Sequence, residues 1–237
     1  MRLLRDACGV LVAMLVCATA WGASTLDYPG LGTVTIERPP GAPRHVVIFL
    51  SGDGGWNKGV VDMARHLVDE EALVAGVDVT QMERQARDSR AACVASAGML
   101  EGLSHFVQQR FGLQHYEKPV LVGYSSGATL AYAALAQAPP GTFKGAVSLG
   151  FWPDLEWSRP LCRGEGLEHD AARIGFVYRP ARHLQEPWIA LQGEQDQVCA
   201  ATPTRDFVAR VPGAEVLMLP KVGHGYSVER NWLPQFT

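Results

Sequence analysis

Apolar runs alternate with amphipathic stretches along most of the chain. The runs that predict strands are residues 33–38, His45–Leu50, 72–79, 119–124, 143–150, 188–192 and Ala214–Leu219. Between them, apolar residues recur at helical spacing over residues 60–68, 86–111 and Ser126–Gln137. Buried strands that alternate with amphipathic helices are typical of a parallel sheet covered on both faces. The pattern therefore predicts an α/β protein with a mostly parallel sheet.

The stretch 151–187 interrupts this alternation. It contains five arginines, two tryptophans and Cys162, without a helical or strand-like period. Apolar runs resume directly after it. We therefore interpret it as an excursion between two strands of one domain, and not as a second domain.

Residues 1–22 have the pattern of a secretory signal peptide. Arg2 and Arg5 precede an apolar run over residues 9–18, and small residues follow at positions that suit cleavage. The apolar run has about 10 residues, whereas a membrane span needs roughly 20. We therefore expect one folded domain over residues 23–237, exported to the periplasm. An uncleaved anchor and a lipid-modified Cys17 are the alternatives.

Composition excludes several classes of protein. The 237 residues are 47% hydrophobic and 19% charged, with a formal net charge of −3. Such a chain is expected to fold, and it lacks the basic excess by which many proteins bind nucleic acid. The sequence has neither a Walker A loop nor a helix opened by G-x-G-x-x-G. We therefore expect no nucleic-acid partner and no cofactor.

Three cysteines remain after the predicted cleavage: Cys93, Cys162 and Cys199. In an oxidising compartment an odd number allows one disulfide and one spare thiol. Cys93 stands among alanines in a helical pattern, so we interpret it as a small buried residue. Cys162 and Cys199 lie in loop-like stretches, and we predict a disulfide between them, with three unpaired thiols as the alternative. No spacing of cysteines and histidines suggests a metal site.

A G-x-S-x-G pentapeptide occupies residues 123–127. It directly follows an apolar run and directly precedes an alanine-rich helical pattern. Strand, turn and helix in this order are the context of a nucleophile elbow, where flanking glycines let a strained serine stand above the sheet. Ser125 is therefore the candidate nucleophile. The alternatives are its neighbour Ser126, or a glycine-rich turn whose serine only caps the helix.

A serine hydroxyl needs a base and a group that orients that base. In this architecture the chain order is serine, acid and histidine. Of the seven histidines, His224 alone follows the last predicted strand, and glycines flank it. Asp196 follows the preceding strand and is the candidate acid, with Glu194 as the alternative.

Backbone N–H groups must stabilise the oxyanion that forms during attack. One candidate is the N–H of Ser126, the residue after the nucleophile. The second is expected in the loop that follows the run His45–Leu50. This loop has the sequence SGDGGW over residues 51–56, and the N–H of Asp53 is the candidate. A flexible turn or a phosphate cradle is the alternative reading of these glycines.

These blocks, in this order, are similar to the α/β-hydrolase fold. The SGDGGW loop stands where ordinary hydrolases have His-Gly. Together with residues 123–127 and the export signal, it resembles the VirJ family of bacterial virulence proteins, which also forms the C-terminal half of AcvB. The resemblance implies a periplasmic serine hydrolase with Ser125, Asp196 and His224 as catalytic residues. Members are associated with removing the amino acid from aminoacyl-phosphatidylglycerol, and with virulence or type IV secretion.

An aminoacyl ester carries a cationic amine, so a carboxylate is expected beside its binding site. Asp53, Asp154 and Glu156 are candidates by their loop positions, although acids in loops are more often only solvated. The resemblance also implies peripheral contact with a membrane and with secretion-system proteins. A generic periplasmic esterase or thioesterase is one alternative function. A non-catalytic hydrolase-fold partner of a type IV secretion system is another.

Tryptophans near the predicted catalytic loops are candidates to line the substrate pocket or to touch lipid. Trp56 closes the SGDGGW loop, and Trp152 and Trp157 follow a predicted strand. Aromatic side chains are more often part of a core. The sequence alone leaves both interpretations open.

Overall fold

The structure, a computed structural model, describes residues 23–237. The predicted signal peptide, residues 1–22, lies outside the described residues. The strands of the main sheet are β1 (Ser24–Tyr28), β2 (Gly32–Glu37), β3 (His45–Leu50), β4 (Ala72–Val77), β5 (Val120–Tyr124), β6 (Gly145–Leu149), β10 (Trp188–Gly193) and β11 (Ala214–Leu219). Their order is β1-β2-β4-β3-β5-β6-β10-β11. A second, small sheet has the order β7 (Asp154–Leu155), β9 (Phe176–Tyr178), β8 (His169–Ala171).

The strands from β4 to β11 in this order are all parallel, whereas β2 pairs in the antiparallel sense with both of its neighbours, β1 and β4. The predicted mostly parallel sheet is therefore confirmed. Parallel strands are buried on both faces, which explains their near-continuous apolar sequences. In β4 every residue from Ala72 to Val77 is buried.

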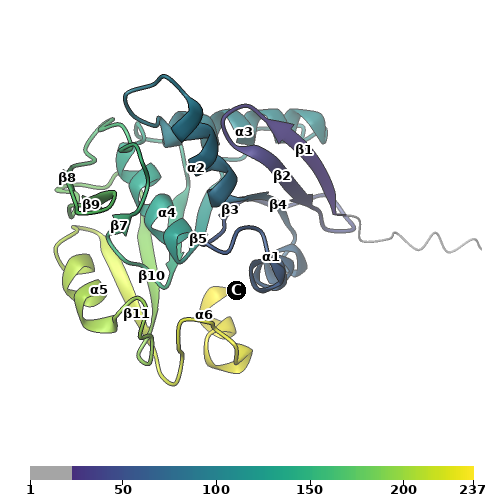
Figure 1. The fold of residues 1–237 in the computed structure, drawn as a ribbon. Coiled ribbons are helices and arrows are strands. Elements are labelled where there is room, and N and C mark those ends of the chain that lie inside the picture. The colour runs from purple at the N-terminus through teal and green to yellow at the C-terminus, as the bar shows by residue number, and fades with distance from the viewer. Residues whose placement is uncertain (1–22) are drawn as a thin grey trace, which may run out of the picture.

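Helices cover both faces of this sheet (Figure 1). They are α1 (Lys58–Asp69), α2 (Val79–Asp88), α3 (Ser96–Arg110), α4 (Ser126–Gln137), α5 (Ala201–Val208) and α6 (Leu233–Phe236), with a 3-10 turn over Glu229–Asn231. One apolar cluster joins the sheet to α1 and α6, and another joins its opposite face to α2, α3, α4 and α5. None of the helices described is both long and apolar enough to cross a lipid bilayer.

The predicted helix over residues 86–111 is interrupted in the structure. It forms the end of α2 and the whole of α3, with an irregular connector over residues 89–95 between them. Arg159 fixes this connector, because its guanidinium donates to the carbonyls of Ala86, Ser89 and Ala91 at 2.8–3.0 Å. An interaction over some 70 residues of sequence separation is invisible to local periodicity.

The predicted disulfide between Cys162 and Cys199 is wrong. Cys162 is bonded to Cys93, across 69 residues of sequence, and Cys199 is a buried free thiol. The connector after α2 explains the pairing, because Cys93 is not helical. It lies beside Val94, whose N–H donates to Pro160 and whose carbonyl accepts from the N–H of Cys162, both at 2.9 Å. These backbone bonds bring the two cysteines together.

Removing this disulfide is expected to destabilise the fold. The double variant Cys93→Ser/Cys162→Ser should lose about 2–4 kcal/mol of unfolding free energy, since a cross-link that closes a long loop restricts the unfolded chain. Urea titration followed by circular dichroism measures the loss. As a control, dithiothreitol should weaken the wild-type protein but leave the double variant unchanged. Equal stability of oxidised wild type and double variant would contradict the expectation.

Candidate active site

Ser125 occupies the sharp turn between β5 and α4. Its φ of 56° and ψ of −124° are a strained backbone conformation for a residue that is not glycine. The two flanking glycines are required by close backbone packing. A Cβ on Gly123 would lie 2.0 Å from the carbonyl oxygen of Gly127, and one on Gly127 would lie 2.2 Å from that of Leu50. This is the geometry expected of a nucleophile elbow.

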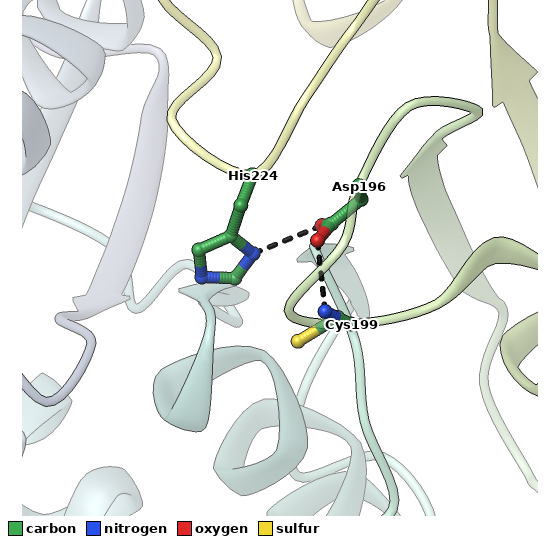
Figure 2. A group of neighbouring side chains, drawn as sticks. All are labelled: Asp196, Cys199 and His224. Carbon is green, nitrogen blue, oxygen red and sulfur yellow. Dashed lines mark hydrogen bonds and ion pairs between the residues drawn. The ribbon is translucent and has the colours of Figure 1, made fainter.

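One line of hydrogen bonds joins the side chains of Ser125, His224 and Asp196. The Oγ of Ser125 lies 3.1 Å from Nε2 of His224, and Nδ1 of His224 lies 2.9 Å from Oδ2 of Asp196. Figure 2 shows the imidazole turned toward the Asp196 carboxylate. The three residues follow β5, β11 and β10, whose C-terminal ends meet at one edge of the sheet. The line has the geometry by which a histidine takes the proton of a serine nucleophile.

Asp196 is buried and is held in its ionised form. Its side chain has no exposed surface, against 20% for His224. Burial by itself raises the pKa of the Asp196 carboxyl, but hydrogen bonds from His224 and from the backbone N–H groups of Cys199 and Val198 outweigh it and lower the pKa. The backbone bonds go to Oδ1 at 2.8 and 2.9 Å, which leaves Oδ2 for the imidazole.

The loop that carries His224 is fixed from two sides. The Tyr124 hydroxyl donates to the backbone carbonyl of His224 at 2.9 Å, and the Tyr226 hydroxyl donates to the carbonyl of Leu191 at 2.6 Å. Trp232 is buried beneath this loop, and its indole N–H donates to the carbonyl of Tyr226. The short C-terminal helix α6 therefore supports the site. Sequence reasoning had not assigned these aromatic residues, because an isolated aromatic carries no signal for such a role.

The alternatives for nucleophile and acid lie outside this line. Ser126 has a buried hydroxyl without a hydrogen-bond partner in the part of the chain that the structure describes. Glu194 is exposed, and the imidazole of His224 is hydrogen-bonded to Asp196 and Ser125 instead.

The two N–H groups expected to hold an oxyanion lie at the mouth of the same site. Asp53 and Ser126 both line a cavity that is also lined by Ser125. Ser126 is the first residue of α4, where the N–H has no partner within the helix. Within residues 23–237, no hydrogen bond engages either N–H. Both groups are therefore free to donate to a substrate oxygen.

Residues 44–149 match the model of a family described as bacterial virulence protein (VirJ). The resemblance to VirJ is confirmed over these residues. They include the SGDGGW loop and Ser125, but neither Asp196 nor His224. The placement of Asp196 and His224 beside Ser125 therefore rests on the hydrogen bonds, and not on the VirJ match. A comparison with curated protein sequences gives no match.

Solved structures show the same fold as the VirJ-like chain. Est1E from Butyrivibrio proteoclasticus has a TM-score of 0.57 at 12% identity, over 90% of this chain and 95% of that one. A dienelactone hydrolase from Anabaena variabilis has 0.59 at 17%, over 91% and 93%. XC6422 from Xanthomonas campestris, described as an α/β serine hydrolase without a lid, has 0.56 at 18%, over 92% and 91%. The chain therefore has the α/β-hydrolase fold.

The SGDGGW loop of the VirJ-matched segment is fixed against the start of α2. The Ser51 hydroxyl accepts from the N–H of Val79 at 3.0 Å. Asp78 caps α2 and also accepts from the backbone N–H of Trp56. Burial raises the pKa of the Asp78 carboxyl, but its hydrogen bonds, from Thr80 first, lower it further than burial raises it. The loop that carries Asp53 is thus anchored to the body of the protein.

Trp56 does not line the cavity at Ser125, so its proposed role in substrate binding is not supported by its position. The indole lies over Gly76 of β4, where a Cβ would come within 2.2 Å of it, and packs edge-on against Phe49. Of the other two tryptophans, Trp152 lines the cavity and Trp157 is buried in the core. The loop turns at Gly55, which directs the side chain at residue 56 away from the nucleophile.

The cavity at Ser125 has a volume of about 270 Å³ and an acidic wall. Asp53, Asp154 and Glu156 all line it. Burial raises the pKa of the Asp154 carboxyl, and the negative charges of Glu156 and Asp53 raise it further. The loop that follows β3 and the excursion that follows β6 thus bring three carboxylates next to the nucleophile. These are the three acids that the sequence offered as candidates for contact with a substrate amine.

Proposed function

We propose that this protein is an exported serine hydrolase that removes the amino acid from aminoacyl-phosphatidylglycerol. The hydrogen-bonded line from Ser125 through His224 to Asp196 carries the proposal of a serine hydrolase. The acidic cavity supports the choice of an acyl group with a cationic amine. The lipid part of the substrate follows from the VirJ resemblance.

The geometry supports a two-step ester cleavage. The Ser125 hydroxyl gives its proton to Nε2 of His224, while its oxygen attacks the ester carbonyl carbon. The N–H groups of Asp53 and Ser126 then stabilise the oxyanion. When this intermediate collapses, His224 returns the proton to the departing glycerol oxygen and the aminoacyl group stays on Ser125. Water, activated by the same histidine, releases the amino acid and restores the enzyme.

Three acids in one cavity favour a cation over a neutral acyl group. An ammonium group within about 4 Å of a carboxylate gains about 4 kcal/mol at an effective dielectric constant of 20. Like-charge repulsion between Asp154, Glu156 and Asp53 is relieved when the cation enters, so binding and charge compensation act together. A neutral acyl chain would not provide this compensation.

The proposed location is the periplasm, with peripheral contact to the membrane that holds the lipid. The Cys93–Cys162 disulfide supports export, because disulfides persist in oxidising compartments. Val198, 68% exposed at the rim of the cavity, is a candidate for contact with lipid. An association with type IV secretion proteins is a further proposal, which follows from the VirJ resemblance alone.

Purified protein, incubated with vesicles that contain lysyl- or alanyl-phosphatidylglycerol, should release the free amino acid. A fluorophosphonate probe should label the same preparation. Rapid cleavage of short nitrophenyl esters without amino acid release would favour a generic esterase. A folded protein that is neither labelled nor active would favour the non-catalytic partner of a secretion system.

Asp154→Asn tests the acidic wall. The ratio of rates for an alanyl ester over the propionyl ester of the same alcohol should fall by about tenfold, which is about 1.4 kcal/mol. The ratio cancels any effect on the catalytic residues themselves, because such an effect acts on both esters equally. Because the pKa of Asp154 is raised, the wild-type ratio should also fall with decreasing pH earlier than an ordinary aspartate would allow. Glu215→Gln, at an exposed acid of β11 outside the cavity, is the control. An equal fall in both variants would contradict the assignment.

A further inference from the structure

A thiol lies beside the catalytic acid and base, where the proposed reaction has no use for it. Cys199 is 5% exposed and is three residues from Asp196. One ligand atom each of Asp196, Cys199 and His224 lies within 4.8 Å of the others. Figure 2 shows the sulfur of Cys199 below the Asp196 carboxylate and the imidazole. A carboxylate, a thiol and an imidazole therefore lie close to one another.

We propose that Asp196, Cys199 and His224 form an inhibitory site for a thiophilic divalent cation, with Zn²⁺ as the principal candidate. Zinc takes a carboxylate oxygen, an imidazole nitrogen and a thiolate at about 2.0–2.3 Å, with water as a fourth ligand in tetrahedral sites. Ligand atoms around a tetrahedral zinc lie about 3.3–3.8 Å from one another. Small side-chain rotations would bring atoms that are within 4.8 Å of one another to that separation. Hard cations such as Mg²⁺ avoid sulfur, so selectivity for soft or borderline metals follows from Cys199.

The ligands are held together by the fold before any metal arrives. The backbone N–H of Cys199 donates to Oδ1 of Asp196 at 2.8 Å. The Gln192 amide, fully buried, donates to the carbonyl of Cys199 at 2.6 Å and to Oδ2 of Asp196 at 3.5 Å. Such supporting groups typically change metal affinity by about 10–100-fold. The site is therefore preorganised on the loop that follows β10.

Charge also favours a divalent cation at this position. Asp196 is ionised, and a coordinated thiol is deprotonated outright, so the bound cation would be neutralised by two negative ligands. A cysteine thiol without a metal is protonated at neutral pH, and it gives up this proton when it becomes a ligand. Binding therefore releases one proton, from sulfur. The cavity lined by both Cys199 and Ser125 gives the ion a path from solvent.

Coordination by His224 stops catalysis whichever ring nitrogen is used. A metal on Nε2 occupies the lone pair that takes the proton of Ser125. A metal on Nδ1 replaces the hydrogen bond to Asp196 and leaves the imidazole proton on Nε2, where a base is needed. The inhibition rests on the proposed hydrolase function, whereas the metal binding does not.

Inhibition by zinc is the first test. Micromolar Zn²⁺ should inhibit ester hydrolysis reversibly, and a chelator should restore it. In Cys199→Ser and Cys199→Ala, each normalised to its own metal-free rate, the half-inhibitory concentration should rise by at least about tenfold. Equal inhibition of the wild type and both variants would overturn the proposal, because it would mean that the thiol is not a ligand.

Cadmium binding tests the site without reference to activity. Cd²⁺ added to Ser125→Ala should produce the ultraviolet charge-transfer band of a cadmium thiolate and release one proton for each ion bound. Adding Cys199→Ala to that variant, prepared as residues 23–237, should remove the band, since the other two cysteines of these residues are joined in the disulfide. If Ser125→Ala shows the band but the wild-type protein has no esterase activity, the proposed function is contradicted and the metal site is kept. An active enzyme without the band would do the reverse.

Discussion

Ser125→Ala is expected to abolish esterase activity, with kcat lower by about 10⁶-fold. The reason is that the 3.1 Å contact between Ser125 and His224 provides the nucleophile and its proton transfer together. Only the oxyanion donors and substrate binding would remain in the variant. Initial rates on nitrophenyl esters and on aminoacyl-phosphatidylglycerol, with fluorophosphonate labelling, measure the effect. Both activities should disappear together, because both substrates would form their acyl-enzyme on the same serine.

Two serine variants separate this loss from unrelated effects. Ser158→Ala removes an exposed hydroxyl outside the cavity and should hydrolyse at the wild-type rate. Ser126→Ala should still be labelled by the probe, since it keeps both Ser125 and the backbone N–H at 126. Labelling that persists in Ser125→Ala but vanishes in Ser126→Ala would move the nucleophile to residue 126.

Asp196→Asn is expected to lower kcat by about 10⁴-fold while leaving the fold intact. The asparagine Oδ1 can still accept from the N–H groups of Val198 and Cys199, so the turn is kept. Its amide, however, would donate toward Nδ1 of His224 and favour the tautomer that has its proton on Nε2. Such an imidazole cannot take the proton of Ser125. Measured kcat and thermal unfolding curves together distinguish a catalytic loss from a structural one.

Glu194→Gln is the matched control for Asp196→Asn. Glu194 stands two residues away on the same loop, but it is exposed and outside the hydrogen-bonded line. Its variant should retain activity within about twofold, as expected for a surface substitution. A severe loss in Glu194→Gln, with little effect in Asp196→Asn, would assign the acid to Glu194.

The sheet could be predicted because burial on both faces leaves a clear sequence pattern. The candidate catalytic residues could be placed near one another for a related reason. Ser125, Asp196 and His224 each follow a parallel strand, and parallel strands end at one edge. The prediction therefore needed no knowledge of side-chain contacts.

Long-range contacts could not be predicted in the same way. The alanines around Cys93 have high helix propensity, yet the connector is held away from the helix by Arg159, which is far along the chain. The disulfide partner of Cys162 depends on that displacement. The position of Trp56 could not be decided from the sequence, because nearness to Asp53 along the chain does not say which way a side chain faces. A single turn residue, here Gly55, is enough to direct the next side chain to the other side of the loop.

The disulfide has a consequence for how the cavity meets its substrate. One wall of the cavity is formed by the excursion that carries Trp152, Asp154 and Glu156. The disulfide joins this excursion to the connector after α2, and Arg159 adds hydrogen bonds to the same connector. This wall therefore loses its conformational entropy once, when the chain folds and the disulfide forms. It does not lose that entropy again each time a substrate binds. The three acids are therefore already held in place before a substrate binds, and the cavity can select a substrate by its charge without first changing shape.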